Sequence, residues 1–73
     1  MADPIQIGDR VKVLLDSSYW KSEGWQEGTV VRIDPYSDHR QFYWVELDRE
    51  AEVAEGGSTR VVSVLNPARI ARL

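Results

Sequence analysis

Few side chains in this sequence could perform chemistry, and their spacing argues against catalysis. The one histidine, His39, lies in a predicted turn near Asp34 and Asp38, and two or three ligands without regular spacing make a nonspecific metal site. The serines lack a base that could activate one of them as a nucleophile. The carboxylates between Glu46 and Glu55 lie in a stretch that we expect to be exposed, where nothing tunes them for acid–base work. The sequence therefore predicts a protein that is not an enzyme, with no metal site and no cofactor.

Binding is the function that the side chains favour. Five cations occupy predicted outward positions or the last strand, and we expect them to form one basic face: Arg10, Lys12, Arg32, Arg69 and Arg72. On a chain with a net charge of −3, such a face would attract an acidic partner and raise the association rate more than the affinity. The alternative interpretation is that these are ordinary outward charges that balance Asp9, Asp16 and Glu27.

Large aromatic residues stand where a connecting segment would usually be small and polar. We expect Tyr19 and Trp20 to plug one end of the domain and Trp25 to lie at a solvated loop tip, in contact with a partner. Phe42 and Trp44 share one face of a strand whose other face is also apolar. Either Trp20 or Trp25 covers them, which we favour, or they form an exposed docking patch. Trp25, Trp44 and Phe42 are the candidate aromatic contact residues.

The elements that must position these residues are short strands. Alternating apolar residues and β-branched runs bounded by turn residues predict five strands, over Arg10–Leu15, Gly28–Asp34, Gln41–Asp48, Thr59–Leu65 and Arg69–Leu73. Asn66–Arg69 predicts a single tight or 3₁₀ turn, because asparagine favours turn starts and proline fixes the next φ. No segment has a helical period, and we expect Glu50–Gly57 to be a solvated loop.

This order of elements is typical of an all-β, five-stranded SH3-like barrel, with a long aromatic loop after the first strand and a one-turn 3₁₀ helix before the last. Residues 1–73 would form one domain, with residues 1–7 as a loose segment. A bulge near Gly28 would decide whether Val30 or Val31 points inward. With Val31 as the provisional choice, the predicted core is Val11, Val13, Val31, Ile33, Val45, Leu47, Val62, Val64 and Ile70.

The stretch Gly8–Asp34 resembles the opening of the photosystem I reaction-centre subunit IV (PsaE) family. The matching residues are Gly8, Val11, Val13, Leu15, Ser18, Tyr19, Trp20, Gly28, Thr29, Val30 and Asp34. The chain departs from the family in the Lys21–Glu27 insert and in lacking an asparagine-rich segment before its last strand. The resemblance implies an SH3-like barrel without a cofactor. It also implies kinship with small accessory proteins that dock onto photosynthetic electron-transfer complexes, such as the ferredoxin-binding subunit of the NADH-dehydrogenase-like complex.

We therefore expect a docking or accessory module of a photosynthetic or related redox complex, with an acidic electron carrier such as ferredoxin or a membrane-complex subunit as its partner. A nucleic-acid- or ribosome-associated barrel is the first alternative, although the pI of about 5.0 counts against it. A peptide-binding adaptor is the second, with a groove for proline-rich ligands lined by Tyr19, Trp20, Trp25 and Tyr36.

Composition sets the remaining expectations. The sequence has no cysteine, so no disulfide can stabilise the domain. No apolar run approaches the roughly 20 residues needed to span a bilayer, and the amino terminus lacks the features of a signal peptide. We expect a cytoplasmic monomer that can lie peripherally on the cytoplasmic or stromal face of a photosynthetic membrane.

Overall fold

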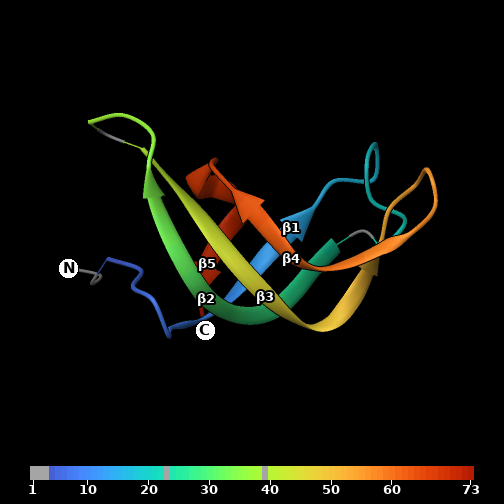
Figure 1. The fold of residues 1–73 in the computed structure, drawn as a ribbon, viewed down its shortest axis with the longest axis horizontal. Helices are drawn as coiled ribbons and strands as arrows, with labels where there is room; N and C mark the ends of the chain where they lie inside the picture. Colours follow the sequence, from blue (N-terminus) through green and yellow to red (C-terminus); the bar gives the residue numbers. More distant parts are fainter. Residues whose placement is uncertain (1–3, 23, 39) are drawn as a thin grey trace.

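A computed structural model describes residues 4–22, 24–38 and 40–73, so His39 lies outside the described residues. Within them the chain is almost entirely strand, and Figure 1 shows one strongly curved sheet. The elements are β1 (Arg10–Leu15), β2 (Gly24–Pro35), β3 (Gln41–Glu52), β4 (Ser58–Val64), the 3₁₀ helix η1 (Pro67–Arg69) and β5 (Ile70–Arg72). The prediction of an all-β, five-stranded domain with a single 3₁₀ turn before the last strand is confirmed.

The sheet is antiparallel and its strand order is β4-β3-β2-β1-β5, so β1 pairs with both β2 and β5. Strands β4 and β5 are its edges, and no ladder joins them among the described residues. Closure of the sheet into a barrel therefore stays a prediction. Asn66 starts η1 as the sequence indicates, because its side-chain oxygen accepts a hydrogen bond of 2.9 Å from the backbone N–H of Ala68.

The core lies on the concave side of this sheet and follows the predicted alternation, with one correction. Val30 is 1% exposed and Val31 is 44% exposed, so Val30 faces the core, a choice that the sequence left open, and Val31 does not belong in the predicted core list. The cause is a bulge between Val30 and Arg32, which turns the intervening residue outward. Ile33 is half-buried and packs against the core. The buried set is Val11, Val13, Leu15, Val30, Val45, Leu47, Ala51, Val62, Val64 and Ile70.

Two strands run further than the sequence predicts. Strand β2 begins at Gly24, and Trp25 pairs with Leu14 of β1, so the prediction that Trp25 lies at a loop tip is wrong. Strand β3 continues to Glu52 past a register shift after Glu46. The segment Glu50–Gly57 is therefore not all loop: Ala51 is only 2% exposed and belongs to the core, because the shift allows pairing to resume beyond the irregular stretch.

The loop after β1 is held against the hairpin that joins β3 to β4. The backbone N–H of Lys21 donates to the carbonyl of Glu52 at 2.8 Å, and the N–H of Ala54 donates to the carbonyl of Tyr19 at 2.9 Å. Trp20 forms an isolated bridge with Val53 and packs on the core. In Figure 1 this loop lies beside the β3–β4 hairpin, while the β2–β3 turn projects at the other end of the molecule. Tyr19 and Trp20 are thus fixed in place by backbone contacts.

Candidate functional site: a charge-paired face and an uncharged groove

Arg10 forms the densest polar contact on the outer face of the sheet. Its guanidinium donates two hydrogen bonds to the carboxylate of Asp48, at 2.8 and 2.6 Å, and a third to the hydroxyl of Thr29 at 2.9 Å. Glu27 lies 3.9 Å away. These bonds to Asp48 raise the pKa of Arg10 and lower the pKa of Asp48. Arg10 therefore joins the three strands β1, β2 and β3 through their side chains.

The other predicted cations also have partners within the chain. Arg32 Nε lies 2.9 Å from Asp34 Oδ1, Arg69 Nη1 lies 3.4 Å from Asp16 Oδ2, and Arg72 Nε lies 3.5 Å from Asp9 Oδ2. Lys12 places its ammonium 4.8 Å from the centre of the Trp25 ring, a cation–π distance. Each of the four predicted arginines therefore has a carboxylate beside it, which reduces the field that it presents to a partner.

The five predicted cations do not share one face. Arg10 and Lys12 point outward from β1, since Val11 and Val13 between and beyond them are buried. Arg72 pairs directly with Val11, and residues opposite each other in a ladder project on the same side, so Arg72 lies on the inner side of the sheet. Binding through these residues stays a prediction. We name the outward set on β1 to β3 the charge-paired face: Arg10, Glu27, Arg32, Asp34 and Asp48.

Asp16 has a local role at the exit of β1. Its carboxylate accepts a hydrogen bond of 2.8 Å from the backbone N–H of Ser18, and Trp20 donates its N–H to the Asp16 carbonyl at 2.8 Å. The pKa of Asp16 is lowered, first by the bond from Ser18 and further by Arg69. Asp16 therefore fixes the turn that presents Tyr19 and Trp20.

The two aromatic residues on the outer face of β3 are half-buried. Trp44 donates its indole N–H to Asp34 Oδ2 at 3.0 Å, so Arg32 and Trp44 share that carboxylate. The ring packed against Phe42 is that of Tyr36, at 5.4 Å between centroids and 81° between planes. Phe42 is thus covered from the β2–β3 turn, rather than by Trp20 or Trp25 as predicted.

A hollow of about 510 Å³ curves over the edge strand β4. Trp44 and Ser63 are ladder partners and line it from the outer face, whereas the buried Val62 and the core-packed Trp20 line it from the inner side. None of the described side chains that line it is charged. We name this hollow the β4-edge groove, and define it by Tyr19, Trp20, Trp44, Val53, Thr59, Val61, Val62 and Ser63.

A second hollow of about 240 Å³ adjoins the β4-edge groove and shares Trp20, Val62 and Ser63 with it. It extends toward the end of β1 and η1, where Asp16 and Arg69 lie. The sequence placed Tyr19 and Trp20 in a possible groove, and the structure places both in one. It does not bring Trp25 or Tyr36 to the same place. Val61 and Thr59 were missed because their place in the groove depends on β4 being an edge, which strand patterns do not indicate.

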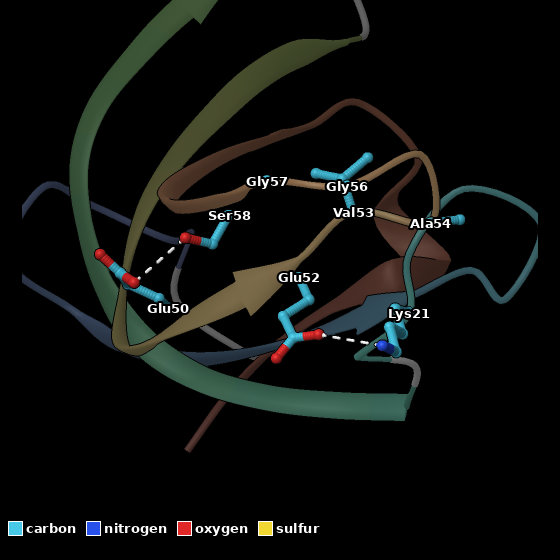
Figure 2. A pocket seen from close by; sticks show the side chains of 8 residues that line it. All are labelled: Lys21, Glu50, Glu52, Val53, Ala54, Gly56, Gly57 and Ser58. Atoms are coloured by element: carbon cyan, nitrogen blue, oxygen red, sulfur yellow. Dashed lines mark hydrogen bonds and ion pairs between the residues drawn. The ribbon is translucent and has the colours of Figure 1, made fainter.

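A third hollow, of about 450 Å³, lies over the β3–β4 hairpin and is shown in Figure 2. Its polar side chains contact one another: Lys21 Nζ lies 3.6 Å from Glu52 Oε2, and Ser58 donates to Glu50 Oε2 at 3.1 Å. Its lining is completed by small hairpin residues, including Gly56 and Gly57, both with positive φ. In the described part of the chain no group of three or more His, Cys, Asp or Glu side chains is placed to hold a metal ion.

The described residues include no helix that is long and apolar enough to cross a membrane. Comparison of the sequence with protein-family models gave no match. Comparisons with curated proteins and with solved structures gave no significant match either. The charge-paired face and the β4-edge groove are therefore the features of the chain from which a function can be inferred.

Proposed function

We propose that this chain is a non-catalytic docking module that binds another protein through the β4-edge groove. One observation carries the proposal. In a chain in which 29% of residues are charged, the groove presents Tyr19, Trp20 and Trp44, and no charged side chain lines it in the part of the chain that the structure describes. Tyr19 is 56% exposed and Val61 is 41% exposed. Contiguous exposed apolar and aromatic surface is typical of interaction sites, and aromatic anchors contribute most of the free energy at many interfaces.

The identity of the partner rests on the resemblance of Gly8–Asp34 to the PsaE family. The chain would then be an accessory protein of photosystem I or of a related electron-transfer complex, and it would position a partner rather than carry electrons. The loop that holds Ser18, Tyr19 and Trp20 is part of that resemblance. The same loop contributes two residues to the groove, so the resemblance and the geometry concern one segment of the chain.

An acidic carrier such as ferredoxin, bound through the predicted cations, is the second candidate. It is favoured by the position of Arg10 and Lys12 on the same outward side of β1. It is opposed by the carboxylates beside Arg10, Arg32, Arg69 and Arg72. Each pair would have to open, or the partner would meet a nearly neutral surface.

The dependence of binding on salt, and a comparison of two matched tyrosine variants, distinguish docking through the β4-edge groove from binding of an acidic carrier. A tagged chain is purified from the cells that produce it, at low and at high salt, together with Tyr19→Ser, Tyr36→Ser and Lys12→Glu variants. Tyr36 is the control for Tyr19, because both are exposed and each stacks edge-on against a half-buried ring. We expect the same redox complex to be retained at both salt concentrations, lost with Tyr19→Ser and kept with Tyr36→Ser and Lys12→Glu.

Retention that vanishes at high salt and with Lys12→Glu, while Tyr19→Ser has no effect, would overturn the proposal in favour of the acidic carrier. Retention of a complex unrelated to electron transfer, still dependent on Tyr19, would keep the docking module and remove the redox assignment.

A further inference from the structure

The backbone at the base of the β4-edge groove is the edge of the sheet. Within the described residues, strand β4 has β3 on one side and no strand on the other. An edge strand directs every second residue's N–H and C=O groups away from the sheet, where they can pair with another chain. The groove is formed around this edge, with Trp44 on one side of it and Trp20 on the other. Its occupant therefore meets both main-chain groups and aromatic rings.

One side chain already contacts this edge. The hydroxyl of Thr59 donates to the carbonyl oxygen of Val61 at 3.1 Å and accepts from the N–H of Val61 at 3.3 Å. A single hydroxyl thus occupies both main-chain hydrogen-bonding groups of Val61, which lines the groove. Natural proteins protect sheet edges from unwanted pairing by such means, and Thr59 gives this edge a reversible protection.

We propose that the groove binds an extended, uncharged segment of the partner, which adds to β4 as a further strand and displaces the Thr59 hydroxyl from Val61. This inference rests on the proposed function and specifies how the groove is used. Addition of a strand to a free edge is an established mode of peptide recognition, in which main-chain hydrogen bonds supply affinity and alternate side chains supply specificity.

The two-sided lining specifies the segment. Side chains of a strand alternate between its two faces, so one set would rest on Trp44 and Val61 and the other on Trp20 and Tyr19. Charged residues are disfavoured, because no lining side chain could pair with a charge that loses its water. Proline is excluded where the segment must donate an N–H to β4. This last requirement distinguishes the segment from a proline-rich ligand.

The test uses an acetylated and amidated peptide of sequence Thr-Val-Thr-Tyr-Thr-Val-Thr, titrated into the isotope-labelled full chain and followed by backbone amide shifts. Two further peptides carry N-methyl groups on alternate residues, one on the odd and one on the even positions. We expect the largest shifts at Val61 and Ser63, and we expect one methylated peptide to bind like the parent and the other not at all. Thr59→Val should bind the parent peptide roughly threefold to tenfold more tightly, because no intramolecular hydrogen bonds are lost.

Three results would overturn the inference. If both methylated peptides bind like the parent, the contact is made by side chains alone. If no peptide binds while Tyr19→Ser still abolishes capture of the partner complex, the groove is a docking site but not a strand acceptor, and the proposed function stands. If β4 amides shift with protein concentration in the absence of peptide, the occupant is a second copy of the chain. Failure of the proposed function is distinguished from these results, because the Tyr19→Ser variant would then still capture the partner complex.

Discussion

The charge-paired face and the β4-edge groove lie on the same curved sheet. They differ in how far their side chains already have partners within the chain. On the face, Arg10 and Asp48 form two short hydrogen bonds, and Arg32 and Asp34 form another. In the groove, Tyr19 stacks on Trp20 and the Trp44 indole bonds to Asp34, but Tyr19 and Val61 remain 56% and 41% exposed. The face has therefore satisfied its strongest interactions within the chain, and the groove has not. A surface rich in charge is not necessarily the surface that binds.

The physical reason lies in the solvent. Ion pairs between exposed side chains contribute little free energy, because water and salt screen them, and a partner gains little by replacing one pair with another. Apolar and aromatic surface gives a larger gain when water leaves it. The comparison predicts that changes on the face alter folding and its pH dependence, whereas changes in the groove alter binding.

The largest effect should come from the strand contact that supports the charge-paired face. A Cβ added at Gly28 would lie 2.5 Å from the carbonyl oxygen of Glu46 and 2.7 Å from Cγ1 of Val45, so Gly28→Ala must push β2 and β3 apart. We expect a loss of unfolding free energy near the upper end of about 1–3 kcal/mol, measured by urea denaturation. Val31→Ala on the same strand is the control. Equal midpoints for Gly28→Ala and the wild type would contradict the close approach.

The bulge in β2 gives the next largest effect. Val30 is 1% exposed and Val31 is 44% exposed, although they are adjacent and identical. Val30→Ala removes two buried methyl groups and should cost about 2 kcal/mol, whereas Val31→Ala should cost less than about 0.5 kcal/mol. Both losses of unfolding free energy are measured from the midpoints of urea denaturation, with the same m-value for the two variants. Similar losses for the two variants would mean that the bulge lies elsewhere.

These two valines also show where the sequence was sufficient and where it was not. Alternation in Arg10–Leu15 defines β1 to the residue, because one face is wholly buried and a slip by one residue would reverse every side chain. At Val30 and Val31 the same rule cannot choose, because a bulge depends on how β3 meets β2. Trp25 was assigned to a loop for a similar reason: its strand pairing with Leu14 is visible only once β1 and β2 are in register.

The candidate site was less predictable than the fold. The types of the residues indicated binding rather than catalysis. Tyr19 and Trp20 stood out for their position in a connecting segment, but they were expected to plug one end of the domain and entered a binding groove only in the peptide-adaptor alternative. The pair of Arg10 with Asp48 could not be inferred, since the two are distant in the sequence. Asp16, beside Arg69, and Asp9, beside Arg72, had been named in the alternative interpretation as carboxylates that balance the cations. Likewise, the importance of Val61 and Thr59 follows from the strand order, which a single sequence does not contain.

A smaller effect should appear on acidification of the charge-paired face. The hydrogen bonds from Arg10 lower the pKa of Asp48 below its ordinary value of 3.8. A carboxyl group of this kind stabilises the folded state above the pKa of the unfolded chain, and that contribution is lost as the pH falls through the folded pKa. Asp48→Asn should therefore be less stable than the wild type near neutral pH and should approach it below about pH 3.8. Thermal unfolding across a pH series measures the difference.

Arg10→Gln provides the matched change on the other side of this pair. It should remove the same acid-dependent part of the stability, and the double variant with Asp48→Asn should lose little more than either single variant. Additive losses would show that Arg10 and Asp48 act independently, and the face would then have cations available to an acidic partner after all.

The smallest change in stability should accompany the largest change in binding. Tyr19 and Tyr36 are 56% and 61% exposed, and each meets its neighbouring ring at 81°. Replacing either with serine should cost about 0.5–1.5 kcal/mol, the usual value of one such aromatic contact, as measured by thermal unfolding. Only Tyr19 lies in the β4-edge groove. If the two variants unfold alike and Tyr19→Ser alone loses the partner, the loss cannot come from a weakened fold, and the binding energy must lie in the groove. If Tyr19→Ser instead unfolds far more easily than Tyr36→Ser, its ring supports the loop, and the contrast between the two regions would have to rest on Val61.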